Sequence, residues 1–339
     1  MKNSGKYRNI MLQISLLLLM SLSPCQSWSD AFDPLIEKAN QGDAGSQFIL
    51  GTMYLNGQGM PQNDQIALGW LNKSAAQNYA KAQYRLGVLY EDGRSVQQSY
   101  DKAAELYYKA ALSGMVRAQF KLAKLYSEGK GVEQNDKKAT EWYKKSAEQG
   151  YPDAQFILGT RYANGNGVSQ SYQKAIEWFT KASAENREAQ FSLGLLYYQG
   201  KGMSINFPKA AEWFEKSANA GNADAQYNLG LMHLKGEGVA QNDKIAFDYF
   251  LKSARQGVVE AQYNLGIMYG KGQGIERSYK DSYIWLLIAS SENKDKNIIN
   301  LKDAVSKRLF LDELVSAQQE AAALQTVIST TLKRQAQEP

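Results

Sequence analysis

The sequence predicts an all-α solenoid built from helix-turn-helix repeats. Three observations predict this fold: a glycine-rich string recurs along the chain, its copies are evenly spaced, and two amphipathic helical stretches accompany every copy. The copies are LNGQGM (55–60), EDGRSV (91–96), SEGKGV (127–132), ANGNGV (163–168), YQGKGM (198–203), LKGEGV (234–239) and MYGKGQGI (268–275). Such repetition indicates architecture rather than a single binding loop.

The repeat spacing sets the domain organisation. Aligned on their glycines, the units start 36 residues apart, with one step of 35, at Ser46, Ala82, Ala118, Ala154, Ala189, Ala225 and Ala261. A repeat array has no central core that limits its length, so the 339 residues predict one elongated domain. We expect a signal peptide at 1–27, an N-terminal capping half repeat at 28–42, seven repeats of about 36 residues at 43–293 and a C-terminal helical cap at 294–339.

The first 27 residues are typical of an export signal. A basic start precedes the apolar run IMLQISLLLLM (10–20), and small and polar residues follow. The run is too short to span a bilayer as a mature helix. We therefore expect an exported protein, periplasmic or secreted, with no membrane span after signal removal.

The stretch LSPC (22–25) resembles a lipoprotein cleavage box. Pro24 stands where such boxes carry a small residue, so cleavage after Ser27 is favoured over lipidation of Cys25. Cys25 is the only cysteine of the chain. Cleavage after Ser27 leaves a mature chain that cannot form disulfides, even in an oxidising compartment.

The charge of the chain gives no sign of a nucleic-acid partner. The net charge is +5, from 39 basic and 34 acidic side chains. Lys2, Lys6 and Arg8 belong to the predicted signal, and their removal leaves 36 basic against 34 acidic residues, a net charge of +2. So small an excess is no electrostatic footprint for a polyanion.

Each unit begins with one helix and continues with a second. In AQYNLGIMY (261–269), apolar or small residues at Ala261, Leu265, Met268 and Tyr269 follow the spacing of one helical stripe. The second helix of a unit starts after a residue that can cap it, and these residues are Asn63, Ser99, Asn135, Ser171, Asn206, Asn242 and Ser278. Its end is marked by a residue that adopts the left-handed conformation readily, at Gly42, Asn78, Gly114, Gly150, Asn186, Gly221, Gly257 and Asn293.

The glycines have two predicted roles. Inside the first helix, the series Gly51, Gly87, Ala123, Gly159, Gly194, Gly230 and Gly266 admits alanine once, so the requirement is a small residue that lets another helix approach. In the recurring string, Gly270, Gly272 and Gly274 are expected to turn the chain from the first helix to the second. A phosphate-binding loop is disfavoured, because no strand precedes the glycines and the closing lysine with serine or threonine is missing.

Both ends of the array carry capping candidates. FDPLIEKANQG (32–42) is typical of a lone second helix ahead of the first full unit. At the other end, one apolar side of a longer helix is expected to cover the last repeat, with Leu311, Leu314, Val315, Leu324, Val327 and Ile328.

These residues resemble the Sel-one-like repeat family, an α/α relative of tetratricopeptide repeats. The resemblance rests on AQFKLAKLYSEGKGVEQNDKKATEWYKKSAEQG (118–150) and AQYNLGLMHLKGEGVAQNDKIAFDYFLKSARQG (225–257), and it extends over roughly residues 31–293. The stretch 283–321 is similar to the terminal segment of secreted bacterial members. Departures are Leu106 and Tyr249 in place of tryptophan, Ser95 in place of glycine, and a missing residue near 186–188. The resemblance implies a right-handed α/α superhelical solenoid.

Chemistry that would indicate an enzyme is sparse. His233 is the only histidine and occupies the repeat position that tyrosine holds elsewhere, so we expect it to pack rather than to catalyse. One histidine and one cysteine cannot form a metal cluster of those residues, and we expect no cofactor.

Some relatives resemble penicillin-binding proteins in activity, which leaves an enzymatic alternative open. The serine-lysine signature occurs at SYDK (99–102), SYQK (171–174) and SENK (291–294). The first two copies begin at a capping serine, and no companion motif accompanies them. The prediction is therefore that the chain is not an enzyme. The alternatives are a penicillin-binding or peptidoglycan-acting enzyme, or a regulator of a cell-wall enzyme.

Residues that recur in every unit are expected to build the fold. Trp70, Trp142, Trp178, Trp213 and Trp285 share one repeat position, which favours core packing between adjacent helix pairs over a ladder for a ligand. The glutamines from Gln47 to Gln262 favour hydrogen bonds to the backbone between repeats.

Function is expected where the units differ. By resemblance to tetratricopeptide arrays, the first helices line a concave surface, and the aromatic residues on them either contact a partner or stabilise neighbouring first helices. The candidate protein-binding residues are Tyr84, Val88, Phe120, Lys124, Phe156, Thr160, Leu195, Tyr198, Tyr227, Leu231 and Tyr263. The resemblance implies an exported scaffold or adaptor that binds an envelope or host protein of a Gram-negative bacterium, with a virulence-associated role among the expectations. The residues specify neither the partner nor the oligomeric state.

Overall fold

The structure is a computed structural model that describes residues 26–337, with side chains for residues 32–334. Within the described residues it contains 17 helices and no strand, so the predicted all-α repeat fold is confirmed. Residues 1–25, which hold Cys25 and most of the predicted signal peptide, lie outside the described residues. No described helix is both long enough and apolar enough to cross a membrane.

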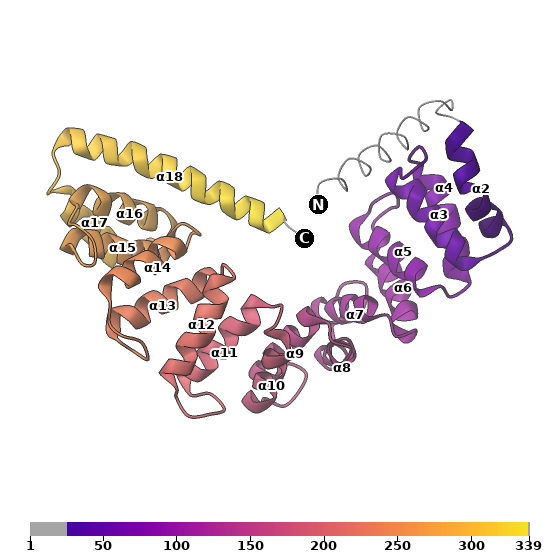
Figure 1. Cartoon of the computed structure of the whole chain (residues 1–339), viewed down its shortest axis with the longest axis horizontal. Helices are drawn as coiled ribbons and strands as arrows, with labels where there is room; N and C mark the ends of the chain where they lie inside the picture. The colour runs from indigo at the N-terminus through magenta and orange to yellow at the C-terminus, as the bar shows by residue number, and fades with distance from the viewer. Residues whose placement is uncertain (1–25, 338–339) are drawn as a thin grey trace, which may run out of the picture. The chain divides into compact units, whose positions relative to one another are not determined.

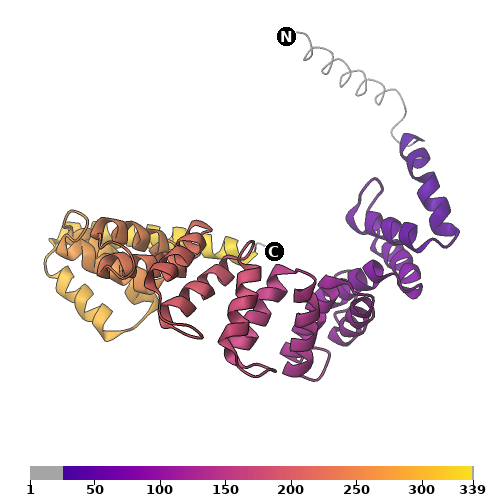
Figure 2. The same ribbon diagram turned by 60° about the horizontal axis from the view of Figure 1, so that its bottom comes forward.

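The chain divides into two compact units, one ending at Tyr151 and the other beginning at Pro152. The first unit contains α2 (Gln26–Asn40), α3 (Ala44–Asn56), α4 (Asp64–Ala76), α5 (Ala80–Asp92), α6 (Tyr100–Leu112), α7 (Val116–Glu128) and α8 (Asp136–Glu148) (Figure 1). The second unit contains α9 (Pro152–Asn164), α10 (Tyr172–Ala182), α11 (Arg187–Gln199), α12 (Phe207–Asn219), α13 (Ala223–Lys235), α14 (Asp243–Ala254), α15 (Val259–Lys271), α16 (Tyr279–Glu292), α17 (Lys296–Ser306) and α18 (Leu311–Gln337). Each odd-numbered helix from α3 to α15 pairs with the helix that follows it, as Figure 2 shows for the second unit.

The predicted helix starts are confirmed at every second helix. The side chain of each predicted cap accepts a hydrogen bond from the backbone N–H three residues later, as Asn63 does from Ile66 and Ser99 from Lys102. The other five caps, Asn135, Ser171, Asn206, Asn242 and Ser278, do the same. The start of these helices is therefore set by local hydrogen bonds that the sequence displays.

The predicted helix stops are confirmed at six positions and wrong at two. Positive φ is found at Gly42, Asn78, Gly114, Gly150, Gly221 and Gly257. Asn186 instead has a φ of −122° and caps α11 by accepting from the N–H of Ala189. The unit that is one residue short lacks the left-handed position, so Asn186 occupies the place of the next cap. Asn293 is extended, with a φ of −132°, because the chain there leaves the repeat pattern toward α17.

The small residue inside the first helix has the predicted role. A β-carbon on Gly194 would lie 2.5 Å from the ring of Phe214, and one on Gly87 would lie 2.7 Å from Tyr107. The large side chain of the second helix therefore packs directly against the backbone of the first helix.

The turn prediction needs one correction. Gly272 and Gly274 have positive φ and turn the chain, but Gly270 lies inside α15. A β-carbon on Gly274 would clash with the backbone carbonyl of Asp243 in the preceding repeat, so this glycine also permits a close approach. Ser95 keeps the positive φ at the equivalent position, and its hydroxyl donates to the carboxylate of Asp64.

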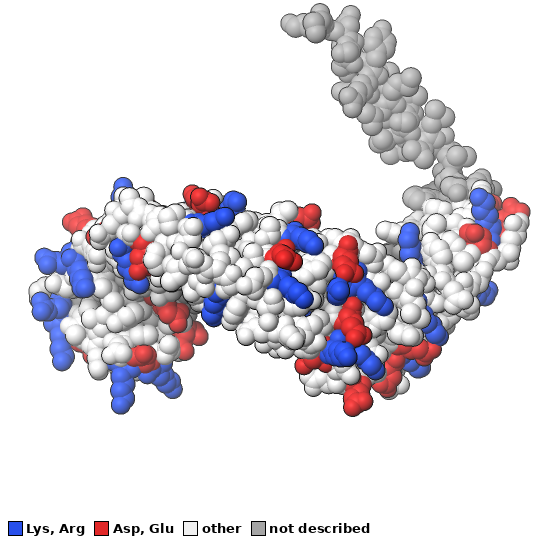
Figure 3. Space-filling view, turned by 90° about the horizontal axis from the view of Figure 1, so that it is seen from below, with Lys and Arg blue, Asp and Glu red and all other residues white. Residues whose placement is uncertain are grey.

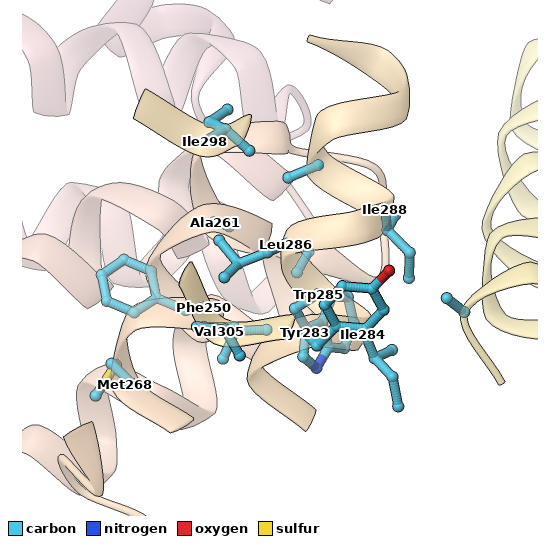
Figure 4. Close-up of a cluster of buried hydrophobic side chains, with 14 of the residues drawn as sticks. Phe250, Ala261, Met268, Tyr283, Ile284, Trp285, Leu286, Ile288, Ile298 and Val305 are labelled. Atoms are coloured by element: carbon cyan, nitrogen blue, oxygen red, sulfur yellow. The ribbon is translucent and has the colours of Figure 1, made fainter. Parts of the chain in front are cut away.

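The last repeat is enclosed by two further helices. Helix α16 is apolar around most of its circumference, from Tyr283 to Ala289, which is typical of a helix buried on several sides. It packs against α15, α17 and α18, and Figure 4 shows Ile284 and Ile288 of α16 on the side that faces the yellow ribbon of α18.

The expected apolar side of α18 is only partly correct. Ile328 is buried in the core of the last repeats together with the small residues Ala317 and Ala321, and Leu314 and Leu324 are half-buried. The other three predicted residues face solvent, with exposed fractions of 78% for Leu311, 46% for Val315 and 62% for Val327. Small residues let α18 lie close to α16, and this contact decides which side of α18 is buried.

Candidate protein-binding surface

The aromatic candidates lie in the first helices and are half-buried. All except Tyr263 pack on a large ring of the second helix in their own repeat; in the repeat of Tyr263 the equivalent residue is Leu286. The ring centroids are 5.6 Å apart for Tyr84 and Tyr107, 5.5 Å for Phe120 and Tyr143, 5.8 Å for Phe156 and Phe179, and 5.8 Å for Tyr227 and Phe250. The second helix therefore holds these rings in place, and one side of each remains near the surface.

The second row of candidates changes chemistry from repeat to repeat. Val88, Thr160, Leu195 and Leu231 are half-buried, and Lys124 is exposed. The hydroxyl of Thr160 donates to the carbonyl of Phe156, so its proton is used within α9. We call the surface formed by these two rows the first-helix face. In each unit it combines apolar side chains with single polar ones, which suits a protein partner.

Glu91 contributes a charge to the first-helix face of the first unit. Its carboxylate accepts from the hydroxyl of Tyr107 and from the ammonium of Lys121, 3.1 Å away. Burial and the neighbouring Glu91 carboxylate raise the pKa of Tyr107 well above its usual range. Lys121 was not among the predicted residues, although its place on the first helix beside Phe120 could have indicated it.

Tyr198 is fixed by three neighbours in the second unit. Its ring lies 5.2 Å from that of Phe207 and 6.4 Å from that of Phe214, and its hydroxyl donates to Glu237 at 2.7 Å. The hydrogen bond to the Glu237 carboxylate, with some burial, raises the pKa of Tyr198 to about 12. Tyr198 therefore links its repeat to the next one, and only part of its ring can meet a partner.

Of the clefts on the second unit, two border the variable row of the first-helix face. A smaller one, of about 200 Å³, is lined by Thr160 and Ala163 of α9, Tyr172 of α10, and Leu195 of α11 among others. A larger one, of about 380 Å³, lies between α15, α16 and α17. The smaller cleft brings together the predicted Thr160 and Leu195. The residues that α17 contributes to the larger cleft lie outside the repeats, and sequence reasoning missed them.

The recurring tryptophans and glutamines serve the fold, as predicted. Trp142 lies edge-on to Tyr108 of the preceding repeat, and Trp213 packs on the core of the repeat before it. A lysine one turn later covers the outer face of the ring, 4.1 Å away for Lys145 on Trp142. The glutamine amides donate across the repeat boundary, as Gln226 does to the carbonyl of Ala218 at 3.2 Å.

The residues considered for catalysis have structural contacts. His233 stacks on Tyr249 with centroids 5.9 Å apart, and its Nδ1 lies 3.1 Å from the carbonyl of Ala240. Ser171 caps α10, while the ammonium of Lys174 lies over the ring of Tyr162. In this serine-lysine pair the two side chains are directed to different partners.

The serines of the other two pairs also have structural contacts. Ser99 caps α6, while Lys102 lies over the ring of Tyr90. Ser291 donates to the carbonyl of Ile288. Within the part of the chain that the structure describes, no three His, Cys, Asp or Glu side chains are placed to hold a metal ion.

The consecutive helix pairs from α3–α4 to α15–α16 define an α/α repeat protein. A family model described as Sel1 repeat matches seven consecutive segments, at residues 44–79, 80–115, 116–151, 152–186, 187–222, 223–258 and 259–294. The chain belongs to the Sel1 repeat family. Sel1 repeat solenoids are generally protein-interaction scaffolds and generally non-enzymatic.

Solved structures of bacterial proteins are similar to the chain. A Sel1 repeat protein from Oxalobacter formigenes is 28% identical, with a TM-score of 0.69 over 84% of this chain and 82% of that one. A protective antigen with an SLR fold from uropathogenic Escherichia coli is 26% identical, with a TM-score of 0.37 over 92% of this chain and 91% of that one. No curated protein matches the chain.

Proposed function

We propose that this protein is an exported scaffold that binds another protein through the first-helix faces of its repeats, in the bacterial envelope or at the host interface. The observation that carries the proposal is that the packing positions of the repeat are largely constant whereas one exposed or half-buried position varies from repeat to repeat. Residues that recur in every repeat are used for packing, whereas Val88, Lys124, Thr160, Leu195 and Leu231 vary at one repeat position. A surface that varies over a constant frame can specify one partner.

The physical character of the face supports a protein ligand. Its aromatic rings are held by the second helices, so little side-chain freedom is lost when a partner covers them. The apolar positions beside them supply the area that anchors an interface. Export is proposed from the basic start and apolar run of residues 1–27, and the mechanism is stoichiometric binding without turnover.

Capture with matched surface variants tests the proposal. The tagged full chain is cross-linked in envelope fractions and in host extract, and the captured proteins are identified by mass spectrometry. The test variant carries Lys124→Glu and Leu231→Glu on first helices. The control carries Lys137→Glu and Ile245→Glu on the second helices of the same repeats, where both side chains are exposed.

The expected result is a stoichiometric partner that the wild type and the control capture and the test variant loses. Reduction of binding by both variants to the same extent would contradict a role for the first-helix face. A saturable hydrolytic activity of the pure protein, or a covalent adduct with a labelled β-lactam, would contradict the scaffold proposal itself.

A further inference from the structure

The larger cleft of the second unit has the same construction as the smaller one. The smaller cleft lies between α9 and α11, beside Tyr172 at the start of α10. The larger cleft lies between α15 and α17, beside Tyr279 at the start of α16. Helix α17 begins 37 residues after α15, close to the repeat length, so it takes the place that the first helix of another repeat would take. We call the larger cleft the C-terminal cleft.

The residue after the first-helix tyrosine or histidine is small in both of these clefts. In chain order this position carries Leu55, Glu91, Ser127, Ala163, Tyr198, Leu234 and Gly270. The two smallest of these residues, Ala163 and Gly270, are the two that line the clefts. Gly270 is helical, and a β-carbon there would meet only Ser282, at 3.1 Å from its Oγ. Its backbone has no positive φ that would require glycine, so the glycine gives room to the Ser282 hydroxyl and leaves space beside it.

The interior of the C-terminal cleft is apolar. Ile267 of α15 lines it together with Leu301, Ala304 and Val305 of α17. The hydroxyl of Ser282 also borders the cleft, but it donates to the carbonyl of Gly266 at 2.6 Å. A ligand group that enters this space therefore meets mainly hydrocarbon, and a volume of about 380 Å³ holds a large apolar side chain.

The edge of the cleft is basic. Lys271 and Arg308 line it and are exposed, and the guanidinium groups of Arg277 and Arg308 each lie 5.8 Å from the ring centroid of Tyr279. No carboxylate of residues 32–334 lies within 4.0 Å of these three cations, whereas Lys280 is paired with Glu320 at 2.7 Å. On the face shown in Figure 3, blue side chains predominate at the end that carries the last helices of the second unit, and blue and red mix elsewhere.

We infer that the C-terminal cleft binds an acidic peptide segment of a partner protein. One large apolar side chain of the segment inserts beside Gly270, and carboxylates next to it lie on Lys271 and Arg308. The charge of the edge and the apolar interior together select this chemistry. Ile267 lines the cleft and also continues the variable row of the first-helix face, so a partner on that face can reach it. The inference rests on the proposed function and names the chemistry of the partner.

Peptide binding to the purified full chain tests this inference. The probe is a fluorescein-labelled octapeptide with one leucine flanked by aspartates on both sides, and its binding is followed by fluorescence anisotropy. Two further peptides replace the leucine with alanine or all aspartates with asparagines. The cleft is filled with Gly270→Leu, and the matched control is Ala163→Leu in the smaller cleft. Leucine is native at this position in Leu55 and Leu234, although there it stands opposite an alanine. In Gly270→Leu the hydroxyl of Ser282, 3.1 Å from the added β-carbon, must shift slightly, and circular dichroism checks that both variants fold.

Gly270→Leu and the alanine peptide are each expected to weaken binding at least about tenfold, because burial of a leucine side chain is lost. Arg308→Glu is expected to weaken binding as well, and Lys252→Glu on a second helix is expected to leave it unchanged. The control Ala163→Leu should bind like wild type.

Equal affinity of the wild type and Gly270→Leu would overturn the inference, as would unchanged binding of the asparagine peptide. Displacement of the peptide by a small amphipathic carboxylate such as decanoate, at lower concentration than by unlabelled peptide, would assign the cleft to a small molecule instead. If the octapeptide does not bind while the capture experiment still finds a partner on the first-helix face, the cleft inference fails and the proposed function stands.

Discussion

Gly230 in α13 packs directly on Phe250 in α14, and a β-carbon on Gly230 would lie 2.6 Å from the ring. Because the ring is fully buried, it cannot move aside without disturbing its neighbours. We expect Gly230→Ala to lower the free energy of unfolding by about 1–3 kcal/mol, the usual cost of overpacking. Urea unfolding followed by circular dichroism measures the loss.

The control for this variant is Gly69→Ala. Gly69 lies within α4 and a β-carbon there would meet nothing within 4 Å. Alanine at such a site is expected to raise the free energy of unfolding by about 0.5–1 kcal/mol, because glycine loses more backbone entropy on folding. If both substitutions raise the free energy of unfolding, the contact with Phe250 does not exclude a β-carbon at position 230 and the prediction is contradicted.

The helix caps could be predicted from the sequence because their hydrogen bonds are local. Asn135 accepts from the N–H of Lys138 in α8 at 2.9 Å. We expect Asn135→Ala to lower the free energy of unfolding by about 1 kcal/mol, since the N–H groups of the first turn lose an acceptor. Asn135→Ser is the control, because serine caps the same helix in three other repeats. The prediction fails if Asn135→Ser is as destabilising as Asn135→Ala in urea unfolding.

Features that depend on distant parts of the chain were harder to predict. The prediction for Asn186 is wrong because one missing residue moves it from the helix stop to the next cap, and composition alone does not distinguish these roles. The sequence predicts a turn at Gly270 because it stands beside two true turn glycines. Its effect on the C-terminal cleft depends on α17, which contacts the last repeat only in the folded chain. Likewise, both sides of α18 carry apolar residues, and packing on α16 selects one.

The buried glutamines are expected to be sensitive to loss of their amide. Gln226 donates to the carbonyl of Ala218 and accepts from the side chain of Gln256 at 2.8 Å. Gln226→Leu preserves the volume but removes both hydrogen bonds. The Ala218 carbonyl still accepts from the N–H of Gly221, so we expect a loss of about 1–2 kcal/mol in the free energy of unfolding. The control Gln241→Leu removes an exposed amide that bonds the carbonyl of Leu234 and should change stability by less than about 0.5 kcal/mol. If Gln226→Leu and Gln241→Leu lower the free energy of unfolding equally in urea, the hydrogen bonds of Gln226 between repeats do not contribute to stability as proposed.

The hydrogen bond from Tyr198 to Glu237 is expected to make stability depend on alkaline pH. The pKa of Tyr198 is raised from 10.0 to about 12, first by the hydrogen bond to Glu237 and then by burial. The folded state therefore holds the phenol proton more tightly than the unfolded state. The resulting stabilisation is fully present below pH 10 and is lost as the pH rises from 10 toward 12.

Tyr198→Phe tests this dependence. Because water reaches the pair, we expect the variant to lose only about 0.5–1 kcal/mol at about pH 9, and the difference from wild type to shrink by about pH 11. Glu237→Gln keeps an acceptor for the hydroxyl but removes the charge, so it should reduce the pH dependence more than the stability at about pH 9. A difference between wild type and Tyr198→Phe that stays constant over this interval would contradict the assignment.

Helix α18 is expected to depend on Ile288 for its attachment. In other repeats a lysine lies over the ring three residues earlier, as Lys181 lies over the buried Trp178 at 4.1 Å, and the lysine is exposed. In the last repeat Ile288 takes the lysine's place and is 1% exposed, within the cluster that includes Ala317 and Ala321 of α18. Ile288→Lys would place an ammonium group in this contact without an acceptor, which costs several kcal/mol if α18 stays in place. We expect α18 to detach instead, while the repeats remain folded.

Limited trypsin digestion with mass spectrometry measures this detachment. Cleavage at Lys307 and Arg308, just before α18, is expected to become at least about tenfold faster in Ile288→Lys, because the local opening that exposes the site becomes more populated. The control Lys252→Ile changes the equivalent position on α14 and should leave cleavage before α18 unchanged. Unchanged cleavage in Ile288→Lys, with the circular dichroism of wild type, would mean that the remaining contacts of α18, such as Lys280 with Glu320, are sufficient to hold it.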